Sequence, residues 1–207
     1  MRILVTGFAP FGGEKINPAY EAVKLLPSTI AGTAIIKAEL PTVFRKGAQV
    51  LQALINAHNP DAVLCIGQAG GRPVISVERV AINLQDARIA DNEGNCPNDE
   101  TISAQGKTAY FSNLPTRAIV QFLRENGVPA ALSYTAGTYV CNDVLYHLLY
   151  WIETLYPQMR GGFIHVPYDP AQVVNLSPPT PSMPIAAISE GLRLALIAII
   201  NSLGVSY

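Results

Sequence analysis

The sequence has few charged residues and no excess of either sign. Lysine and arginine number 14 against 15 acidic residues, which gives a net charge of −1 over 207 residues. Proteins that bind nucleic acid or an anionic membrane surface usually carry a clear basic excess. The charge balance therefore argues against both partners and favours a small neutral one.

Cysteine is also scarce, and the three residues Cys65, Cys96 and Cys141 lie far apart. An odd number of widely spaced cysteines fits neither a disulfide framework nor the ligand spacing of a zinc site. We expect reduced thiols in a cytoplasmic protein, with no metal or other cofactor. The apolar stretch at the N-terminus is too short for the h-region of a signal peptide, which predicts no export.

Long uninterrupted apolar runs are missing as well. The apolar pattern near the C-terminus is broken by Ser189, Glu190, Gly191 and Arg193, so we expect no membrane span. The hydrophobic fraction is nevertheless 49%, enough to bury a substantial core within one domain, which we expect to cover residues 1–207.

Short apolar runs alternate with segments of helical periodicity along the chain. This alternation predicts an α/β fold with helices covering a mostly parallel sheet. The expected strands are residues 2–7, 33–40, 62–67, 74–84, 129–134 and 161–167. The expected helices are residues 17–27, 42–58 with Thr42 as N-cap, 115–126 ended by Gly127, 142–156 and 185–200.

Four loops that follow expected strands carry unusual residues. They read GFAPFGG, GQAGGR, TAGTYVCND and HVPYD. Ligands of open parallel sheets bind at the carboxyl ends of the strands, so we expect a site where these loops meet. The polar segment 86–107 is longer than an ordinary connection and is a candidate rim or lid of that site.

Cys141 is the candidate nucleophile. It lies where a strand turns into a helix, and the unpaired N–H groups and dipole of a helix start favour a thiolate. The alternative is that Cys141 is a small buried core residue, as free cysteines commonly are.

His165 is the only histidine suited to act as its general base, because it closes an apolar strand beside the Cys141 loop. His58 lies at a helix end before a turn. His147 follows Cys141 within the same helix on a different face, so both other histidines are interpreted as structural. A structural role is also the alternative for His165.

Glu78 is the candidate acid that would fix the orientation of the histidine. It lies in an extended and mostly apolar segment, where a carboxylate needs a partner. An ion pair with Arg72 or Arg79 is the alternative explanation.

The motifs TGFAPFGG…NP (6–18), GQAGGR…ISVERVAIN (67–83), DARIADNEG (86–94), TAGTYVCN (135–142) and GGFIHVP (161–167) resemble, in this order, those of type I pyroglutamyl peptidases. These are cytoplasmic cysteine peptidases that remove an N-terminal pyroglutamate, a five-membered lactam, from peptides. The resemblance implies a three-layer αβα sandwich like that of the phosphorylases and hydrolases, a homotetramer, and a catalytic triad of Glu78, Cys141 and His165.

The resemblance also implies a set of substrate-binding residues, which are Phe8, Phe11, Asn17, Gln68, Arg88, Tyr139 and Val140. Phe8 and Phe11 would hold the lactam between two apolar faces, and Gln68 would help to satisfy its amide. Asn17 would brace the first glycine loop. Backbone N–H groups of the turn around Tyr139 and Val140, together with Arg88, would hold the oxyanion.

Each of these roles has a structural alternative. The two phenylalanines are also compatible with core packing, Gln68 with loop capping, and Arg88 with a salt bridge to Asp86 or Asp91. Tyr139 stands where the family usually has phenylalanine, so its hydroxyl needs a partner or solvent. The segment around Thr42 and Val43 departs from the family pattern, and no substrate contact is expected there.

Two other functions were weighed against the peptidase. A nucleoside-phosphorylase-like enzyme would bind phosphate at the first glycine loop, but that loop holds two phenylalanines and only Lys15 as a nearby cation. A catalytically inactive binder of blocked peptide termini would not need all three triad residues, and this sequence has them.

Overall fold

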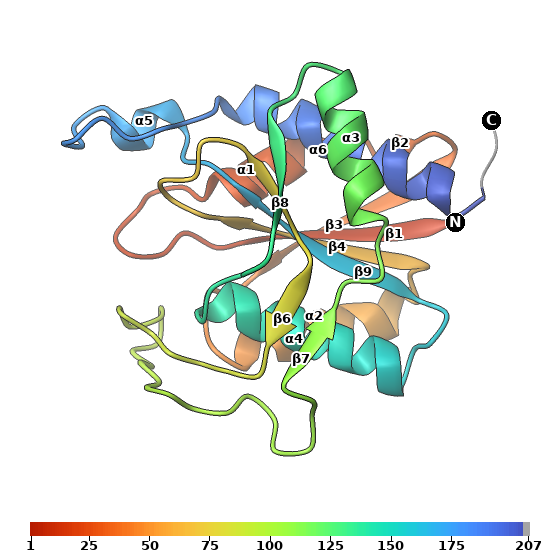
Figure 1. The fold of residues 1–207 in the computed structure, drawn as a ribbon, viewed down its shortest axis with the longest axis horizontal. Helices are drawn as coiled ribbons and strands as arrows, with labels where there is room; N and C mark the ends of the chain where they lie inside the picture. Colours follow the sequence, from red (N-terminus) through yellow and green to blue (C-terminus); the bar gives the residue numbers. More distant parts are fainter. Residues whose placement is uncertain (205–207) are drawn as a thin grey trace.

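The computed structural model describes residues 1–204, which form an α/β fold around one large sheet (Figure 1). Seven strands hydrogen-bond in the order β2-β3-β1-β4-β9-β5-β8. Their bounds are β1 Arg2–Phe8, β2 Thr29–Ile30, β3 Thr33–Leu40, β4 Ala62–Gln68, β5 Ile75–Glu78, β8 Ala130–Ser133 and β9 Arg160–Val166. β1 and β4 are buried along nearly their whole length, as the continuous apolar runs of their sequences predict.

The sheet is mostly parallel, with two exceptions that shape the site. β3, β1, β4 and β9 run in one direction, and the short β2 pairs antiparallel with β3. β5 pairs antiparallel with β9 and parallel with β8, so β5 and β8 both run against the central strands. The loop after β8 therefore leaves its strand in the direction opposite to the loops after β1, β4 and β9, and it turns back to reach α4.

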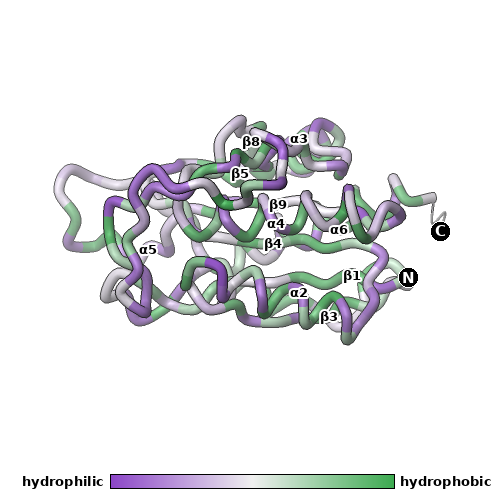
Figure 2. Tube along the Cα trace, turned by 90° about the horizontal axis from the view of Figure 1, so that it is seen from below, coloured by the Kyte–Doolittle hydropathy of each residue, from purple (hydrophilic) through white to green (hydrophobic). Residues whose placement is uncertain are grey.

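Helices cover both faces of the sheet and make three layers (Figure 1). One layer holds α1 Pro18–Leu25, α3 Thr116–Glu125 and α6 Ile185–Ser202, and the other holds α2 Lys46–His58 and α4 Val140–Thr154. Each layer has its own hydrophobic cluster against the sheet. Figure 2, seen from the side of α2 and α4, shows hydrophobic residues along β1 and β4 and hydrophilic residues mostly toward the margin of the molecule. The expected three-layer fold is confirmed.

The segment predicted as one long strand over residues 74–84 is divided in two. β5 ends at Glu78, and β6 Val80–Ile82 leaves the main sheet to pair antiparallel with β7 Ala109–Phe111. The break falls at Arg79, whose N–H donates to Ser133 O and whose carbonyl accepts from Ser112 N. Arg79 is therefore held to both sheets, which an alternating sequence pattern does not reveal.

The prediction of Thr42 as an N-cap is wrong. α2 begins at Lys46, and its N-cap is Arg45, which adopts a positive φ of 62°. The Thr42 hydroxyl donates instead to Ala9 O at 2.7 Å and ties the end of β3 to the loop after β1. By contrast, α3 ends just before Gly127 as expected, and α1 begins at Pro18 with Asn17 as its N-cap, a role that was not assigned to Asn17 from the sequence.

α6 is long and apolar enough to cross a membrane when judged by length and composition alone, with a mean hydropathy of 1.5. Half of it is buried within the protein, where it packs against α1 and α3. Its apolar character is therefore accounted for by its place in the core. The short helix α5 Pro170–Val173 lies on a segment that projects from the body (Figure 1).

Candidate active site

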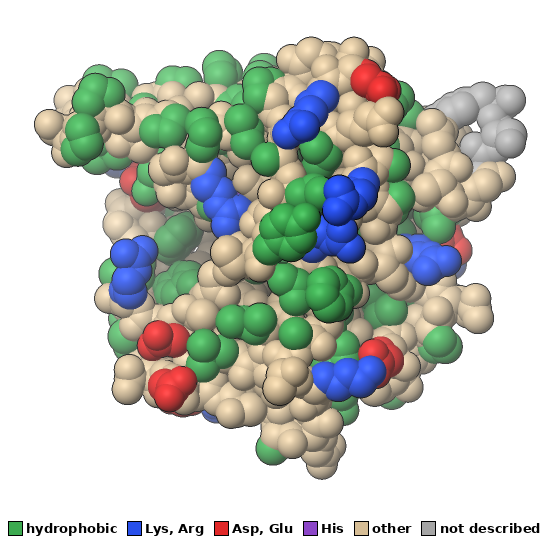
Figure 3. Space-filling view, viewed as in Figure 1, with side chains coloured by type: hydrophobic (Ala, Val, Ile, Leu, Met, Phe, Trp, Pro, Cys, Tyr) green, Lys and Arg blue, Asp and Glu red, His purple; other side chains and the backbone are tan. Residues whose placement is uncertain are grey.

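A cavity of about 260 Å³ opens at the sheet edge where β1, β4 and β9 end. Figure 3 shows the surface hollowed below the projecting segment that carries α5. The cavity is lined by Phe8, Phe11, Asn17, Thr42, Gln68, Ala69, Gly70, Arg72, Arg88, Ala136, Gly137, Tyr139, Cys141 and His165. Residues from all the predicted site motifs except the Glu78 segment therefore meet around one space.

Cys141 lies at the second position of α4 and lines the cavity. The small residues before it carry the chain back from β8, with Gly137 at a positive φ of 77°. Its sulphur packs against the backbone of Gly67, where an added Cβ would lie 2.8 Å from Sγ. The glycine thus leaves room for the thiol directly beside the end of β4.

His165 and Glu78 form a buried pair on the α4 side of the sheet. His165 Nδ1 lies 2.8 Å from Glu78 Oε1, and the side chains are 4% and 0% exposed. Because β5 is antiparallel to β9, Ser76 lies opposite His165 and Glu78 lies opposite Phe163. The contact is therefore a diagonal one between neighbouring strands, and it leaves Nε2 of His165 as the other ring nitrogen for the cavity.

Arg72 is the second partner of Glu78. Its Nη1 donates to Glu78 Oε1 at 2.6 Å and to Ser133 Oγ at 3.2 Å, and its Nη2 donates to Thr135 O at 2.9 Å. The alternatives weighed for Glu78 are thus not exclusive, because it contacts both the histidine and an arginine. Arg79 has no such contact among the described residues, and its guanidinium lies over the ring of Tyr134.

Burial has the largest effect on the protonation of His165. Removal from water lowers the pKa of His165 below 6.5, and Arg72 lowers it further, against the opposing effect of Glu78. Burial would raise the pKa of Glu78, but the contact with His165 and the positive charge of Arg72 outweigh burial and lower it. Near neutral pH, His165 is therefore a neutral base held by an ionised carboxylate.

The thiol of Cys141 is not acidic in the free site. Burial raises the pKa of Cys141 to about 12, and the negative charge of Glu78 adds to this, while Arg72 and a local backbone hydrogen bond oppose it. The low-dielectric surroundings outweigh the helix terminus, so the proton must pass to a nearby base when the sulphur attacks.

Aromatic rings form the apolar walls of the cavity. Phe8 is 2% exposed and packs on Phe163 with ring centroids 6.1 Å apart, so it belongs to the core as well as to the cavity. Phe11 lies 6.0 Å from the ring of Tyr139. The hydroxyl of Tyr139 donates to Ala90 O at 3.0 Å, which gives the extra oxygen of this tyrosine a partner outside the cavity walls.

Polar side chains hold the loops around the cavity. Asn17 accepts from Ala19 N at 3.1 Å and donates to Ala9 O at 3.2 Å, and so it braces the loop after β1. Gln68 lines the cavity, and its Oε1 accepts from Gln172 Nε2 at 3.0 Å. Thr42 also lines the cavity, although no substrate contact was expected there.

The two residues assigned to the oxyanion differ in their placement. Arg88 lines the cavity, and within residues 1–204 it forms no ion pair with Asp86, Asp91 or another acid within 4 Å. Val140 does not line the cavity, because its side chain is fully buried in the core beneath α4. A substrate contact by the Val140 side chain is thus not supported, which leaves its backbone N–H.

The polar segment 86–107 borders the cavity. It is organised around the buried Asp91, whose carboxylate accepts backbone N–H groups of Phe44, Glu93 and Asn95. Asn92 Nδ2 donates to Pro10 O at 2.8 Å and joins the segment to the loop after β1. The segment is therefore tied to the loop after β1 and to the turn before α2, and it forms a rim of the cavity.

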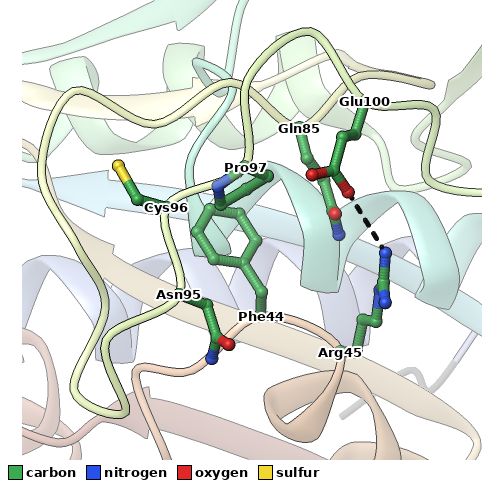
Figure 4. A pocket seen from close by; sticks show the side chains of 7 residues that line it. All are labelled: Phe44, Arg45, Gln85, Asn95, Cys96, Pro97 and Glu100. Carbon is green, nitrogen blue, oxygen red and sulfur yellow. Dashed lines mark hydrogen bonds and ion pairs between the residues drawn. The ribbon is translucent and has the colours of Figure 1, made fainter.

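A second cavity, of about 240 Å³, lies on the other side of this rim (Figure 4). It is lined by Phe44, Arg45, Gln85, Asn95, Cys96, Pro97 and Glu100. Figure 4 shows Arg45 and Glu100 paired at its margin, at 3.3 Å. It contains none of the predicted site residues, and the thiol of Cys96 donates to Ala87 O. Among the described residues, no cluster of three or more potential ligands for a metal occurs.

Comparison with known proteins agrees with this geometry. The family model described as pyroglutamyl peptidase matches residues 1–202. The chain belongs to the pyroglutamyl peptidase family. It is 56% identical over 200 residues to the pyrrolidone-carboxylate peptidase of Clostridium perfringens, covering 97% of this chain and 93% of that protein.

Solved structures of the family share the fold. The pyroglutamyl peptidase I of Bacillus amyloliquefaciens matches with a TM-score of 0.92 and 47% identity, covering 96% of this chain and 94% of that one. The pyrrolidone carboxyl peptidase of Thermococcus litoralis matches with a TM-score of 0.94 and 38% identity, covering 98% and 94%. The expected family and α/β fold are thus confirmed, and the chain is a cysteine-type hydrolase by family.

Proposed function

We propose that this protein removes N-terminal pyroglutamate from peptides by acyl transfer through Cys141, His165 and Glu78. The observation that carries the proposal is the cavity itself, which joins a thiol at a helix start, a buried histidine held by a carboxylate, and apolar ring walls. Family membership supplies the reaction, and the geometry supports the roles proposed for the residues.

His165 acts as the general base in the first step. Its neutral imidazole takes the proton from Cys141 Sγ as the sulphur attacks the carbonyl between pyroglutamate and the next residue. Glu78 stabilises the imidazolium that forms, because its carboxylate contacts Nδ1. The imidazolium then protonates the departing amine, and neutral His165 later activates the water that hydrolyses the thioester.

The developing oxyanion is held at the start of α4. Val140 and Cys141 lie in the first turn, where backbone N–H groups have no acceptor within the helix. Arg88 reaches the same cavity and is available as a positively charged donor. Only the backbone of Val140 takes part.

The cavity favours a neutral lactam over a free amino terminus. No acidic side chain is among the described residues that line it, whereas Arg72 and Arg88 are. An α-ammonium group placed there would lose its hydration without gaining a counter-charge. This would raise the free energy of binding by roughly several kcal/mol. Phe8 and Phe11 offer apolar faces to the ring, and Gln68 offers a hydrogen bond to its amide.

The test is cleavage of a chromogenic pyroglutamyl amide under reducing conditions, beside the corresponding glutamyl and prolyl amides. The native chain should cleave only the lactam substrate. Cys141→Ala should lower kcat/KM by about 10³-fold or more. Cys96→Ser, which changes an exposed thiol lining the other cavity, should retain native activity and serves as the matched control.

Two results would contradict this function. One is a well-folded native chain that binds the pyroglutamyl amide without releasing amine, which would favour the inactive binder. The other is cleavage that persists in Cys141→Ala, since the reaction would then need another nucleophile.

We further propose that the protein acts in the cytoplasm as a homo-oligomer, a tetramer by family resemblance. Its three free cysteines suit a reducing compartment. The apolar side of α6 is buried within the chain and leaves little surface for an interface. The projecting segment around α5 is the better candidate, because Val174 and Leu176 are 76% and 46% exposed there (Figures 1 and 3).

Light scattering coupled to size exclusion tests this assembly. The native chain should elute as an oligomer, and Val174→Asp with Leu176→Asp should lower the mass, because charges replace apolar contacts. Leu25→Asp changes an equally exposed residue on α1 and should leave the mass unchanged. A native monomer would contradict the proposal.

A further inference from the structure

Arg72 occupies a position that neither the triad nor the lactam pocket explains. It lies in the loop between β4 and β5, and its guanidinium spans three parts of the site. It reaches Glu78 on β5, Ser133 at the end of β8, and the carbonyl of Thr135 in the loop that leads to Cys141. A single planar group thus joins the acid of the triad to the chain segment before the nucleophile.

The two donors of Glu78 converge on the same oxygen. Both Arg72 Nη1 and His165 Nδ1 lie within 2.8 Å of Oε1. Oε2 is buried and receives no hydrogen bond from the described part of the chain. No hydrogen bond to Oε2 fixes the rotation of the carboxylate. The position of Oε1 relative to His165 therefore depends on the hydrogen bond from Arg72.

The positive charge of Arg72 also reaches the reacting groups. Within residues 1–204, the groups that titrate or carry charge around His165 are Glu78 from β5, Cys141 from α4, Arg72 from the β4–β5 loop, and Arg88, which lines the same cavity. Arg72 lowers the pKa of both His165 and Cys141, whereas Glu78 raises both. It therefore opposes the effect of the acid that orients the base, and it helps to keep His165 unprotonated.

We propose that Arg72 is a positioning residue of this peptidase, which fixes Glu78 Oε1 against His165 and couples that pair to the loop that leads to Cys141. It acts through Glu78 and through the backbone of Thr135, and it takes no proton in the reaction. The inference rests on the proposed function, since it assigns Arg72 a role in that same site.

Three variants separate geometry from charge. Arg72→Gln removes the charge and the planar fork, while Arg72→Lys keeps the charge but cannot donate to Glu78 and Thr135 together. Arg79→Gln is the matched control, because it removes the same charge from a nearby residue that lies over Tyr134 and does not line the cavity. All are made in the Cys96→Ser background, so that Cys141 is the reactive thiol that alkylation reports.

The measurements are kcat and KM for the pyroglutamyl amide across pH, and the His165 titration followed by NMR. Arg72→Gln should lower kcat by about 10-fold to 100-fold through misplacement of the base, with a smaller change in KM. It should also shift the acid limb of kcat/KM and the His165 titration to higher pH, and slow alkylation of Cys141 at a given pH. Arg72→Lys should lower kcat but leave the acid limb near its native position.

An unchanged acid limb and kcat in folded Arg72→Gln would overturn the proposal, and so would a loss of thermal stability with native kcat. If Arg72→Gln does not fold, Arg72→Lys decides, because native kcat in that variant would also overturn it. The His165 titration and the alkylation rate need no turnover. An inactive native chain would therefore defeat the proposed function without being mistaken for a result on Arg72.

Discussion

Two buried carboxylates in this protein each contact a histidine, yet their surroundings differ. Asp143, on α4, is 0% exposed and lies 3.2 Å from His147 Nδ1. Glu78, on β5, is also 0% exposed and lies 2.8 Å from His165 Nδ1. Both acids stand beside the site, since Asp143 follows the nucleophile by two positions on the same helix.

The difference lies in how the oxygens are satisfied. Asp143 accepts from Arg45 N at 2.8 Å through one oxygen and from Gln85 Nε2 at 2.7 Å through the other. Both donors of Glu78 converge on one oxygen. Asp143 thus ties the start of α2 and the rim to α4 as a structural connection. The geometry at Glu78 instead directs one oxygen at one histidine nitrogen, which is what an orienting acid requires.

Replacement of the two histidines should show this contrast most strongly. His165→Asn should lower kcat/KM by about 10³-fold or more, because the general base is lost. His147→Asn should stay within about threefold of native activity, because His147 contacts Asp143 and lies outside the cavity. The pyroglutamyl amide assay measures both, and a comparable loss in His147→Asn would remove the distinction.

Replacement of Glu78 should mainly lower activity, whereas replacement of Asp143 should mainly lower stability. Glu78→Gln should lower kcat by about 100-fold or more with a small change in thermal stability, because the imidazolium loses its counter-charge. Asp143→Ala should cost about 2 to 4 kcal/mol of unfolding free energy, because buried donors lose their acceptor. Denaturant unfolding beside activity per folded molecule checks this, and equal losses of stability in the two variants would contradict it.

The smallest effect is a difference in pH dependence between the two pairs. Asp143 raises the pKa of His147 above 6.5 despite burial, so the stability from this pair is present below that value and is lost as pH rises through the folded-state pKa. Burial lowers the pKa of His165, so its contribution is present above 6.5 and is lost as pH falls.

Melting temperatures at about pH 5.5 and about pH 8.5 test these signs. His147→Asn should be more destabilising, relative to native, at the acid pH. His165→Asn should be less destabilising there than at the alkaline pH. The acid limb of native kcat/KM should fall below pH 6.5, in keeping with the lowered pKa of His165. If the destabilisation of either variant changed with pH in the opposite direction, the pKa direction assigned to that histidine would be wrong.

Much of the fold was predictable because local patterns carry it. Strands such as residues 62–67 are continuous apolar runs, and α1 begins at an Asn-Pro pair that caps it. Local sequence patterns do not reveal how the strands pair. The division of residues 74–84 at Arg79 depends on β7, and the reversed direction of β5 depends on β9, and both partners are distant in sequence.

The site residues also divide into those that local sequence patterns reveal and those that depend on distant contacts. Cys141 and His165 were identifiable because each lies near the end of a helix or strand. The sequence also has only three cysteines and three histidines to choose from. The sequence indicates Arg72 only as an alternative partner of Glu78, because its other two contacts, with Ser133 and Thr135, lie about sixty residues further along the chain. The raised pKa of Cys141 was missed because a sequence shows a helix start but not how deeply the thiol is buried.

Gly67 carries a consequence for how this protein can vary. An added Cβ there would lie 2.7 Å from Phe163 Cζ and 2.8 Å from Cys141 Sγ, closer than real Cβ atoms come to other atoms. Even alanine, the smallest substitution, would have to displace either a core ring or the nucleophile. We therefore expect this position to tolerate no side chain in any active descendant of this sequence, a limit imposed by the space behind the sulphur rather than by the chemistry in front of it.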